Sequence, residues 1–141
     1  MGSLRLDDQL CFALYAAQRA VTTAYRPLLD ELGLTYPQYL AMLVLWERDA
    51  ILVRELGAAL KLDYGTVSPL LKRLEAAGLV RRERTAADER AVRIGLTERG
   101  AALRARAEAV PAELVERTGL AGPDIARLRA ELHDLAARAA G

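Results

Sequence analysis

The chain contains a single cysteine, Cys11, and a tyrosine follows it four residues later at Tyr15. The surrounding segment has the pattern of a helix, on which residues four apart share one face. A cysteine thiolate attacks peroxides, and a tyrosine hydroxyl stabilises such an anion without adding charge. A free cysteine is, however, more often a small buried hydrophobic residue without reactivity. Position alone therefore favours a structural role for Cys11.

A second group of residues with chemical potential lies between residues 72 and 99. This segment holds eight basic and five acidic residues, a net charge of +3, whereas the rest of the chain carries −2. A local excess of basic charge is typical of a surface that binds nucleic acid, although a solvated charged face is the simpler alternative. The side chains suited to phosphates or groove edges are Lys72, Arg73, Arg82, Arg84, Arg90 and Arg93.

Length and composition describe an ordinary globular protein. The chain has 141 residues, of which 52% are hydrophobic and 28% charged, enough for one domain with its own core. The apolar runs are too short to span a membrane and no leader sequence opens the chain, so we expect a cytoplasmic protein with no membrane partner. One cysteine and one histidine allow neither an internal disulfide nor a zinc cluster, and we expect no cofactor.

The first part of the chain has the periodicity of helices. Apolar residues at helical spacing predict a helix over residues 6–32, which ends at Gly33. Thr35 and Gln38 form a capping box that opens a second helix, which ends near residue 49. A short helix follows over residues 53–60.

The central part predicts a further helix and a hairpin. Val67, Leu70, Leu71 and Leu74 form one apolar stripe of a helix that ends at Gly78. Because Pro69 is unfavourable deep in a helix, we expect the regular helix to begin close to residue 66 or to bend there. Residues 79–84 and 90–96 are predicted strands around a polar tip. A long helix then starts after Thr97, with a bend or break near Pro111, and a final helix covers residues 124–139.

Two short helices joined by a tight turn and followed by a basic hairpin form a winged helix-turn-helix arrangement. A helix fits the major groove of DNA, and polar residues near its start reach the base edges. The hairpin can carry arginine to the neighbouring minor groove. We therefore predict a mainly α fold with a small β-hairpin. It comprises a winged helix-turn-helix part over residues 36–96 and dimerisation helices over residues 4–33 and 97–140.

In sequence the chain resembles the MarR (multiple antibiotic resistance regulator) family. The similarity is strongest to its one-cysteine organic hydroperoxide resistance regulators and covers residues 4–136. The segments that carry the resemblance, in order and at family spacing, are Leu10-Cys11-Phe12-Ala13-Leu14-Tyr15, Thr35-Tyr36-Pro37-Gln38-Tyr39, Leu62-Asp63 with Gly65-Thr66, Pro69-Leu70-Leu71-Lys72-Arg73 and Asp88-Glu89-Arg90.

The resemblance implies a role for each matching residue. Cys11 would be the peroxide-reactive thiol, Tyr25 and Tyr36 would hydrogen-bond it from the partner subunit, and Tyr15 would lie nearby. The residues that it implies in DNA binding are Asp63, Tyr64, Thr66, Ser68 and Arg73, together with the wing arginine Arg90 and the Asp88 that orients it. Their basic charge adds Lys72 and Arg84 to the predicted DNA-binding residues. Two residues depart from the pattern. Leu52 replaces a capping threonine or serine of the third helix, and Tyr64 replaces a smaller residue at the start of the recognition helix.

The expected function is that of a transcriptional repressor rather than an enzyme. A homodimer would bind a palindromic double-stranded DNA operator and would release it when an organic hydroperoxide oxidises Cys11. Without a second cysteine, the resulting sulfenic acid would react with a low-molecular-weight thiol, form a cyclic sulfenamide or become overoxidised.

Two other functions fit parts of the sequence. The first is a repressor of the same family that a small aromatic ligand releases from DNA without thiol chemistry. The second is a thiol peroxidase that turns over peroxide at Cys11. The peroxidase alternative leaves the basic helix and hairpin without a purpose.

Overall fold

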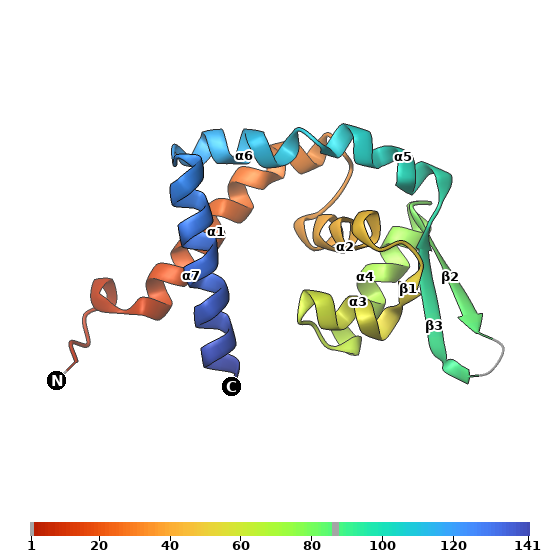
Figure 1. Cartoon of the computed structure of the whole chain (residues 1–141), viewed down its shortest axis with the longest axis horizontal. Coiled ribbons are helices and arrows are strands. Elements are labelled where there is room, and N and C mark those ends of the chain that lie inside the picture. Colours follow the sequence, from red (N-terminus) through yellow and green to blue (C-terminus); the bar gives the residue numbers. More distant parts are fainter. Residues whose placement is uncertain (1, 86–87) are drawn as a thin grey trace. The chain divides into compact units, whose positions relative to one another are not determined.

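The computed structural model describes residues 2–85 and 88–141, and the side chains of all of these except residues 85 and 88–90. The chain forms two compact units. The first ends at Glu108 and the second begins at Ala109. In chain order the first unit contains a 3₁₀ turn (Leu6–Asp8), α1 (Leu10–Asp30), α2 (Tyr36–Glu47), β1 (Ile51–Leu52), α3 (Val53–Leu60), α4 (Tyr64–Ala76), β2 (Val80–Thr85), β3 (Asp88–Leu96) and α5 (Glu98–Ala107) (Figure 1). The second unit contains α6 (Val110–Thr118) and α7 (Gly122–Ala140).

Polar side chains fix where the helices of the first unit begin. Thr35 accepts a hydrogen bond from the Gln38 backbone and the Gln38 side chain accepts one from Thr35 N, so the predicted capping box is confirmed. Leu52 has no side-chain acceptor for the start of α3. Glu55 Oε1 accepts a hydrogen bond from Leu52 N at 3.0 Å, which is only one of the two hydrogen bonds of a capping box.

α4 begins at Tyr64, two residues before the expected start at residue 66, and runs through Pro69. Asp63 is the reason for the early start. Its carboxylate accepts a hydrogen bond from Thr66 N at 2.9 Å and so caps the first turn. Pro69 removes the bond to the carbonyl of Gly65, which is exposed to water in that first turn. The helix therefore tolerates the proline.

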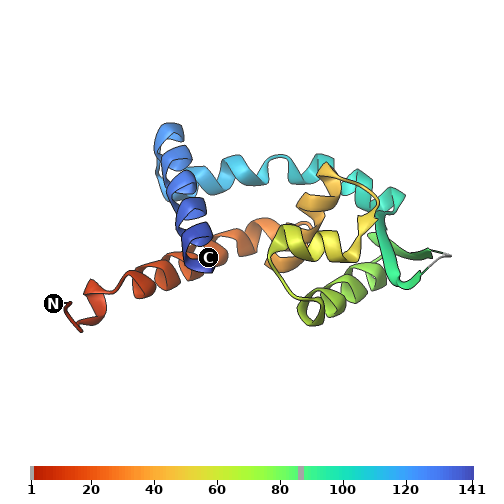
Figure 2. The same cartoon turned by 60° about the horizontal axis from the view of Figure 1, so that its bottom comes forward.

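The three strands form an antiparallel sheet in the order β1-β3-β2. β2 has the predicted length and lies one residue later than predicted, whereas β3 begins two residues earlier than predicted. In both views the hairpin β2–β3 lies beside α4 (Figures 1 and 2). β1 was not predicted at all. It has only two residues and pairs Ile51 with Ile94, so its strand geometry comes from the distant partner rather than from a local pattern.

The core of the first unit combines the apolar faces of its helices with the inner face of the sheet. The side chains of Leu45, Leu56, Leu71 and Ile94 have no exposed surface. Trp46 is half-buried, and its Nε1 donates a hydrogen bond to Gly100 O at 2.9 Å. This contact attaches α2 to the first turn of α5.

The predicted interruption near Pro111 is confirmed. α5 ends at Ala107, and Pro111 lies in the first turn of α6, where the missing N–H costs nothing. The final helix begins at Gly122, two residues earlier than predicted, because Pro123 is likewise accommodated in a first turn. No side chain of α7 is buried, and Leu128 and Leu132 are 44% and 40% exposed.

Candidate nucleic-acid interface and thiol site

Helices α3 and α4 form the helix-turn-helix, and α4 carries most of the predicted DNA-binding residues. Its apolar stripe of Val67, Leu70, Leu71 and Leu74 is buried, as predicted from the spacing. This leaves the other faces of α4 for contacts with a ligand. The exposed or half-buried residues there are Asp63, Tyr64, Thr66, Ser68, Lys72 and Arg73.

Asp63 has a defined task at the start of this helix. The side-chain hydroxyl and the backbone N–H of Thr66 both donate to its carboxylate, and these bonds lower the pKa of Asp63 below its usual range. The carboxylate is therefore fully charged at neutral pH. Its place at the helix N-terminus makes Asp63 a capping residue, and both it and Thr66 remain accessible to solvent.

The hairpin divides the basic residues into two groups. Arg84 is exposed, as expected of a residue that contacts DNA. Arg82 is instead paired with Glu75 of α4, since its Nη2 lies 3.2 Å from Glu75 Oε1 and its backbone N donates to Glu75 Oε2 at 3.1 Å. Arg93 donates to Ala50 O at 2.7 Å. Both guanidinium groups thus make contacts within the protein, Arg82 as a half-buried residue and Arg93 as an exposed one, and the suitability of the two residues for phosphates stays a prediction.

Two residues assigned to the wing, Asp88 and Arg90, lie in β3, but their side chains are outside the part of the chain that the structure describes. Their assignment stays a prediction. The backbone register nevertheless pairs Thr85 with Asp88, so both residues flank the hairpin tip.

We expect Arg73→Ala to weaken DNA binding on the order of tenfold at low salt and to reduce the slope of log K against log salt concentration by about one. Loss of one phosphate contact releases about one counterion fewer on binding. Titrations at several salt concentrations measure this slope. Arg5→Ala removes the same charge from the exposed N-terminal segment and should leave the slope unchanged. An unchanged slope in Arg73→Ala would refute the phosphate contact.

The thiol lies on the surface of α1. Cys11 is exposed in the single chain, so the alternative of a cysteine buried within the protomer does not hold. Tyr15 is 55% exposed, and the guanidinium carbon of Arg19 lies 5.4 Å from the centre of its ring. Tyr15 and Arg19, one helical turn apart, therefore form a cation–π contact.

Tyr25 and Tyr36 form part of a cluster of three tyrosines. The ring centre of Tyr25 lies 5.2 Å from that of Tyr36 and 5.6 Å from that of Tyr39, both at tilted angles. Burial, and then the proximity of Tyr39 and Tyr36, raises the pKa of Tyr25 to about 12. Burial also raises the pKa of Tyr36 and of Tyr39. The three hydroxyls are therefore protonated at neutral pH and can act as hydrogen-bond donors.

The resemblance did not assign a role to Tyr39, whose side chain is 2% exposed and contacts Tyr25 directly. Its spacing of three residues from Tyr36 on one helix is the signal that could have indicated it. The Glu75–Arg82 pair had no comparable signal, because the two residues lie on different elements.

The raised pKa of Tyr25 predicts a dependence of stability on alkaline pH. A pKa of about 12 in the folded state, above the usual 10, stabilises the fold at neutral pH, and this stabilisation is lost as pH rises from about 10 to about 12. Urea unfolding across this range should show a shallower decline in Tyr25→Phe than in the wild type. Tyr64→Phe, at a position 68% exposed, is the control and should follow the wild type. Equal slopes in Tyr25→Phe and the wild type would contradict the prediction.

The described residues were also compared with the requirements of a metal site and of a membrane span. Among them, no three histidine, cysteine, aspartate or glutamate side chains are grouped closely enough to hold a metal ion. No helix in the same part of the chain has the length and apolar character needed to cross a bilayer.

A helix-turn-helix followed by a β-hairpin, with an exposed polar and basic helix face, defines a winged helix-turn-helix DNA-binding protein. Comparison with known proteins agrees. Residues 23–106 match the family model of the transcriptional regulator SarA/Rot. The chain is 46% identical over 132 residues to the organic hydroperoxide resistance transcriptional regulator of Bacillus subtilis (strain 168), covering 94% of this chain and 90% of that protein.

Two further relatives support the same family. The HTH-type transcriptional regulator TtmR of Methylorubrum extorquens (strain PA1) is 49% identical over 135 residues, covering 91% of this chain and 69% of that protein. The structure of reduced AbfR bound to DNA superposes with a TM-score of 0.79 at 34% identity over 98% of this chain and 96% of that one, and AbfR has been crystallised from Staphylococcus epidermidis. The chain belongs to the MarR family of transcriptional regulators, among the organic hydroperoxide resistance regulators.

Proposed function

We propose that this regulator is a homodimeric repressor that binds a palindromic DNA operator and releases it when an organic hydroperoxide oxidises Cys11. In the reduced dimer, Tyr25 and Tyr36 of one protomer donate hydrogen bonds to the Cys11 thiolate of the other. Recognition helix α4 enters the major groove, and the hairpin reaches the minor groove through Arg90, which Asp88 orients.

The observation that carries the proposal is the long distance between Cys11 and the tyrosines Tyr25 and Tyr36 within one chain. Cys11 and Tyr25 lie on the same helix α1, and 14 residues at 1.5 Å each place them about 21 Å apart along its axis. Tyr36 packs against Tyr25 and not near Cys11. Since α1 is one continuous helix, the exposed thiol can meet these hydroxyls only from a second copy of the chain.

Exposed apolar side chains support a dimer. On or next to α1 they include Leu6, Leu10 and Leu14, and on α7 Leu128 and Leu132. Such residues on helices outside the DNA-reading part are typical of a helical interface between subunits. A two-fold dimer in turn requires half-sites about one helical turn apart.

The proposed redox step is a two-electron oxidation of sulfur. The Cys11 thiolate attacks the distal oxygen of the hydroperoxide, the O–O bond breaks, and the alkoxide takes up a proton and leaves as an alcohol. Cys11 becomes a sulfenic acid. A low-molecular-weight thiol then displaces water from the sulfenic acid and forms a mixed disulfide. The sulfenic acid no longer presents an anion to the hydroxyls of Tyr25 and Tyr36, which shifts the dimer away from its DNA-binding arrangement.

The proposal is tested on a duplex selected by the wild-type protein from a random DNA library. Binding is titrated with and without cumene hydroperoxide, and the oxidised protein is treated with a sulfenic-acid trapping reagent and analysed by mass spectrometry. We expect loss of binding together with the trapped adduct on the peptide that contains Cys11. Loss of binding without modification of Cys11 would refute the redox mechanism.

One observation favours the alternative of release by a small aromatic ligand. A hollow of about 280 Å³ lies between α1 and the start of α2. It is lined by Thr22, Arg26, Leu29, Asp30, Leu34, Thr35, Tyr36 and Pro37. Apolar walls beside an arginine and a tyrosine hydroxyl suit an aromatic acid. Release of the DNA by benzoate or salicylate under reducing conditions would favour this alternative.

A further inference from the structure

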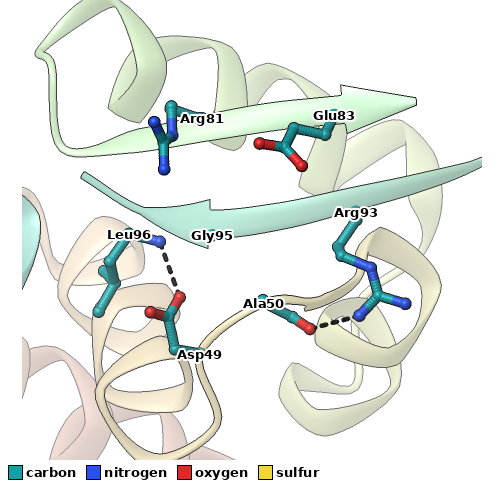
Figure 3. Close-up of a pocket in the computed structure, with 7 residues that line it drawn as sticks. All are labelled: Asp49, Ala50, Arg81, Glu83, Arg93, Gly95 and Leu96. Atoms are coloured by element: carbon teal, nitrogen blue, oxygen red, sulfur yellow. Dashed lines mark hydrogen bonds between the residues drawn. The ribbon is translucent and has the colours of Figure 1, made fainter. Parts of the chain in front are cut away.

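The turn between α2 and β1 is attached to the base of the hairpin by two hydrogen bonds (Figure 3). Asp49 Oδ1 accepts from the backbone N of Leu96 at 2.8 Å. On the other side of Gly95, Arg93 Nη1 donates to the backbone oxygen of Ala50 at 2.7 Å. The two bonds hold the last residues of β3 against the turn that follows α2. We call this pair of bonds the wing clasp.

The backbone around the wing clasp is shaped for close approach. Ala50 has a φ of +61°, in the left-handed region that non-glycine residues seldom adopt. The facing strand lies within contact distance of this turn, since a Cβ at Gly95 would lie 3.4 Å from Asp49 Oδ1 and 3.8 Å from Ala50 Cα. The turn then continues directly into β1, which pairs Leu52 with Arg93. The wing clasp therefore lies beside the β1–β3 pairing.

The opposite edge of the hairpin is attached to the recognition helix. Glu75 of α4 accepts hydrogen bonds from the backbone and the guanidinium group of Arg82 in β2. The hairpin base is thus held at β2 by α4, and at β3 by the wing clasp together with the two residue pairs of β1. Without the wing clasp, only the short β1 pairing would hold β3 on this side, so the hairpin would be freer to change its direction.

We propose that Asp49 is a positioning residue for DNA binding, because the wing clasp fixes the direction of the hairpin relative to recognition helix α4. A fixed angle lets the helix contact the major groove and the hairpin contact the minor groove at the same time. Holding this angle in the free protein avoids an ordering cost on binding. Asp49 does not touch the DNA in this role. Its acceptor oxygen is what matters, so asparagine can replace it.

The test compares Asp49→Ala with Asp49→Asn, which remove the same charge, whereas only asparagine keeps an oxygen that can accept from Leu96 N. On the duplex selected by the wild type, we expect about tenfold weaker binding for Asp49→Ala. Hydroxyl-radical footprinting should show loss of the flanking minor-groove protection, with protection at the sites of α4 retained. Asp49→Asn should bind within about twofold of the wild type. Glu47→Ala is the matched control for charge, since Glu47 is exposed two residues earlier.

Three outcomes would overturn the inference: a wild-type footprint in Asp49→Ala, a uniform loss of protection in both grooves with a lowered unfolding temperature, or an Asp49→Asn protein that behaves like Asp49→Ala. If Asp49→Ala does not fold, Arg93→Met removes the other bond of the wing clasp, and the same loss of minor-groove protection is expected. A wild-type protein that selects no DNA would instead refute DNA binding itself, and the inference is independent of the thiol chemistry.

Discussion

Cys11→Ser is expected to bind the selected DNA duplex as tightly as the wild type and to remain bound in the presence of an alkyl hydroperoxide. Serine keeps the size of the side chain and can still hydrogen-bond the tyrosine hydroxyls. It does not ionise near neutral pH and does not attack the O–O bond. Where the wild type loses at least about tenfold in affinity, the variant should lose none, and this removal of the response is the largest effect that we expect on function.

The measurement is a DNA titration by fluorescence anisotropy with and without cumene hydroperoxide, on both proteins. Ala13→Ser is the matched control, since it places a hydroxyl on an exposed position of the same helix and leaves the thiol intact. It should respond to peroxide as the wild type does. Release of DNA by Cys11→Ser on oxidation would show that another group senses the peroxide and would refute the proposed function.

Gly100→Ala is expected to lower the free energy of unfolding by about 3 kcal/mol and the unfolding temperature by roughly 10 °C. The first turn of α5 lies against the junction of α4 and β2, where a Cβ at residue 100 would overlap the carbonyl oxygen of Leu79. The neighbourhood cannot easily move away. Gly100 N donates to Thr97 Oγ1 at 3.0 Å, and Gly100 O accepts the bond from Trp46.

Gly65→Ala is the matched control for this substitution. Gly65 also lies in the first turn of a helix, but a Cβ there would meet only Asp63 Oδ1, at the ordinary contact distance of 3.7 Å. Alanine favours a helix more than glycine does, so we expect unchanged or slightly higher stability. Thermal unfolding followed by circular dichroism measures both variants. Equal stability of Gly100→Ala and the wild type would contradict the close packing of α5 on Leu79.

The local signals predicted most of the helices but not every boundary. The capping box at Thr35 and the apolar stripe of α4 depend on residues within two turns of each other, so the sequence displays them directly. α4 begins two residues before the position that Pro69 suggested, because Asp63 caps its first turn. β1 escaped prediction, since two residues have no measurable period and the pairing with Ile94 spans 43 positions.

The candidate site was likewise predictable only in part. The types of its residues, a lone thiol, several tyrosines and a basic segment, were evident from the sequence, and with the resemblance they indicated the family. Which arginines form hydrogen bonds within the protein was not evident, because Arg82 and Arg93 look identical to Arg84 along the hairpin. The structure shows internal hydrogen bonds for the half-buried Arg82 and the exposed Arg93, and it places Arg84 on the exposed surface.

By itself, the sequence determined the order of the helices and the hairpin and the capping box at Thr35, because these depend on neighbours along the chain, and it showed a single cysteine directly. Only the tertiary structure decided that the wing clasp joins Asp49 to Leu96 and that Tyr25 packs against Tyr36 and Tyr39. It also put Cys11 on the surface, about 21 Å along α1 from Tyr25. The physical reason is that hydrogen bonds and ring packing act over a few ångströms of space, and only folding brings distant segments within that reach.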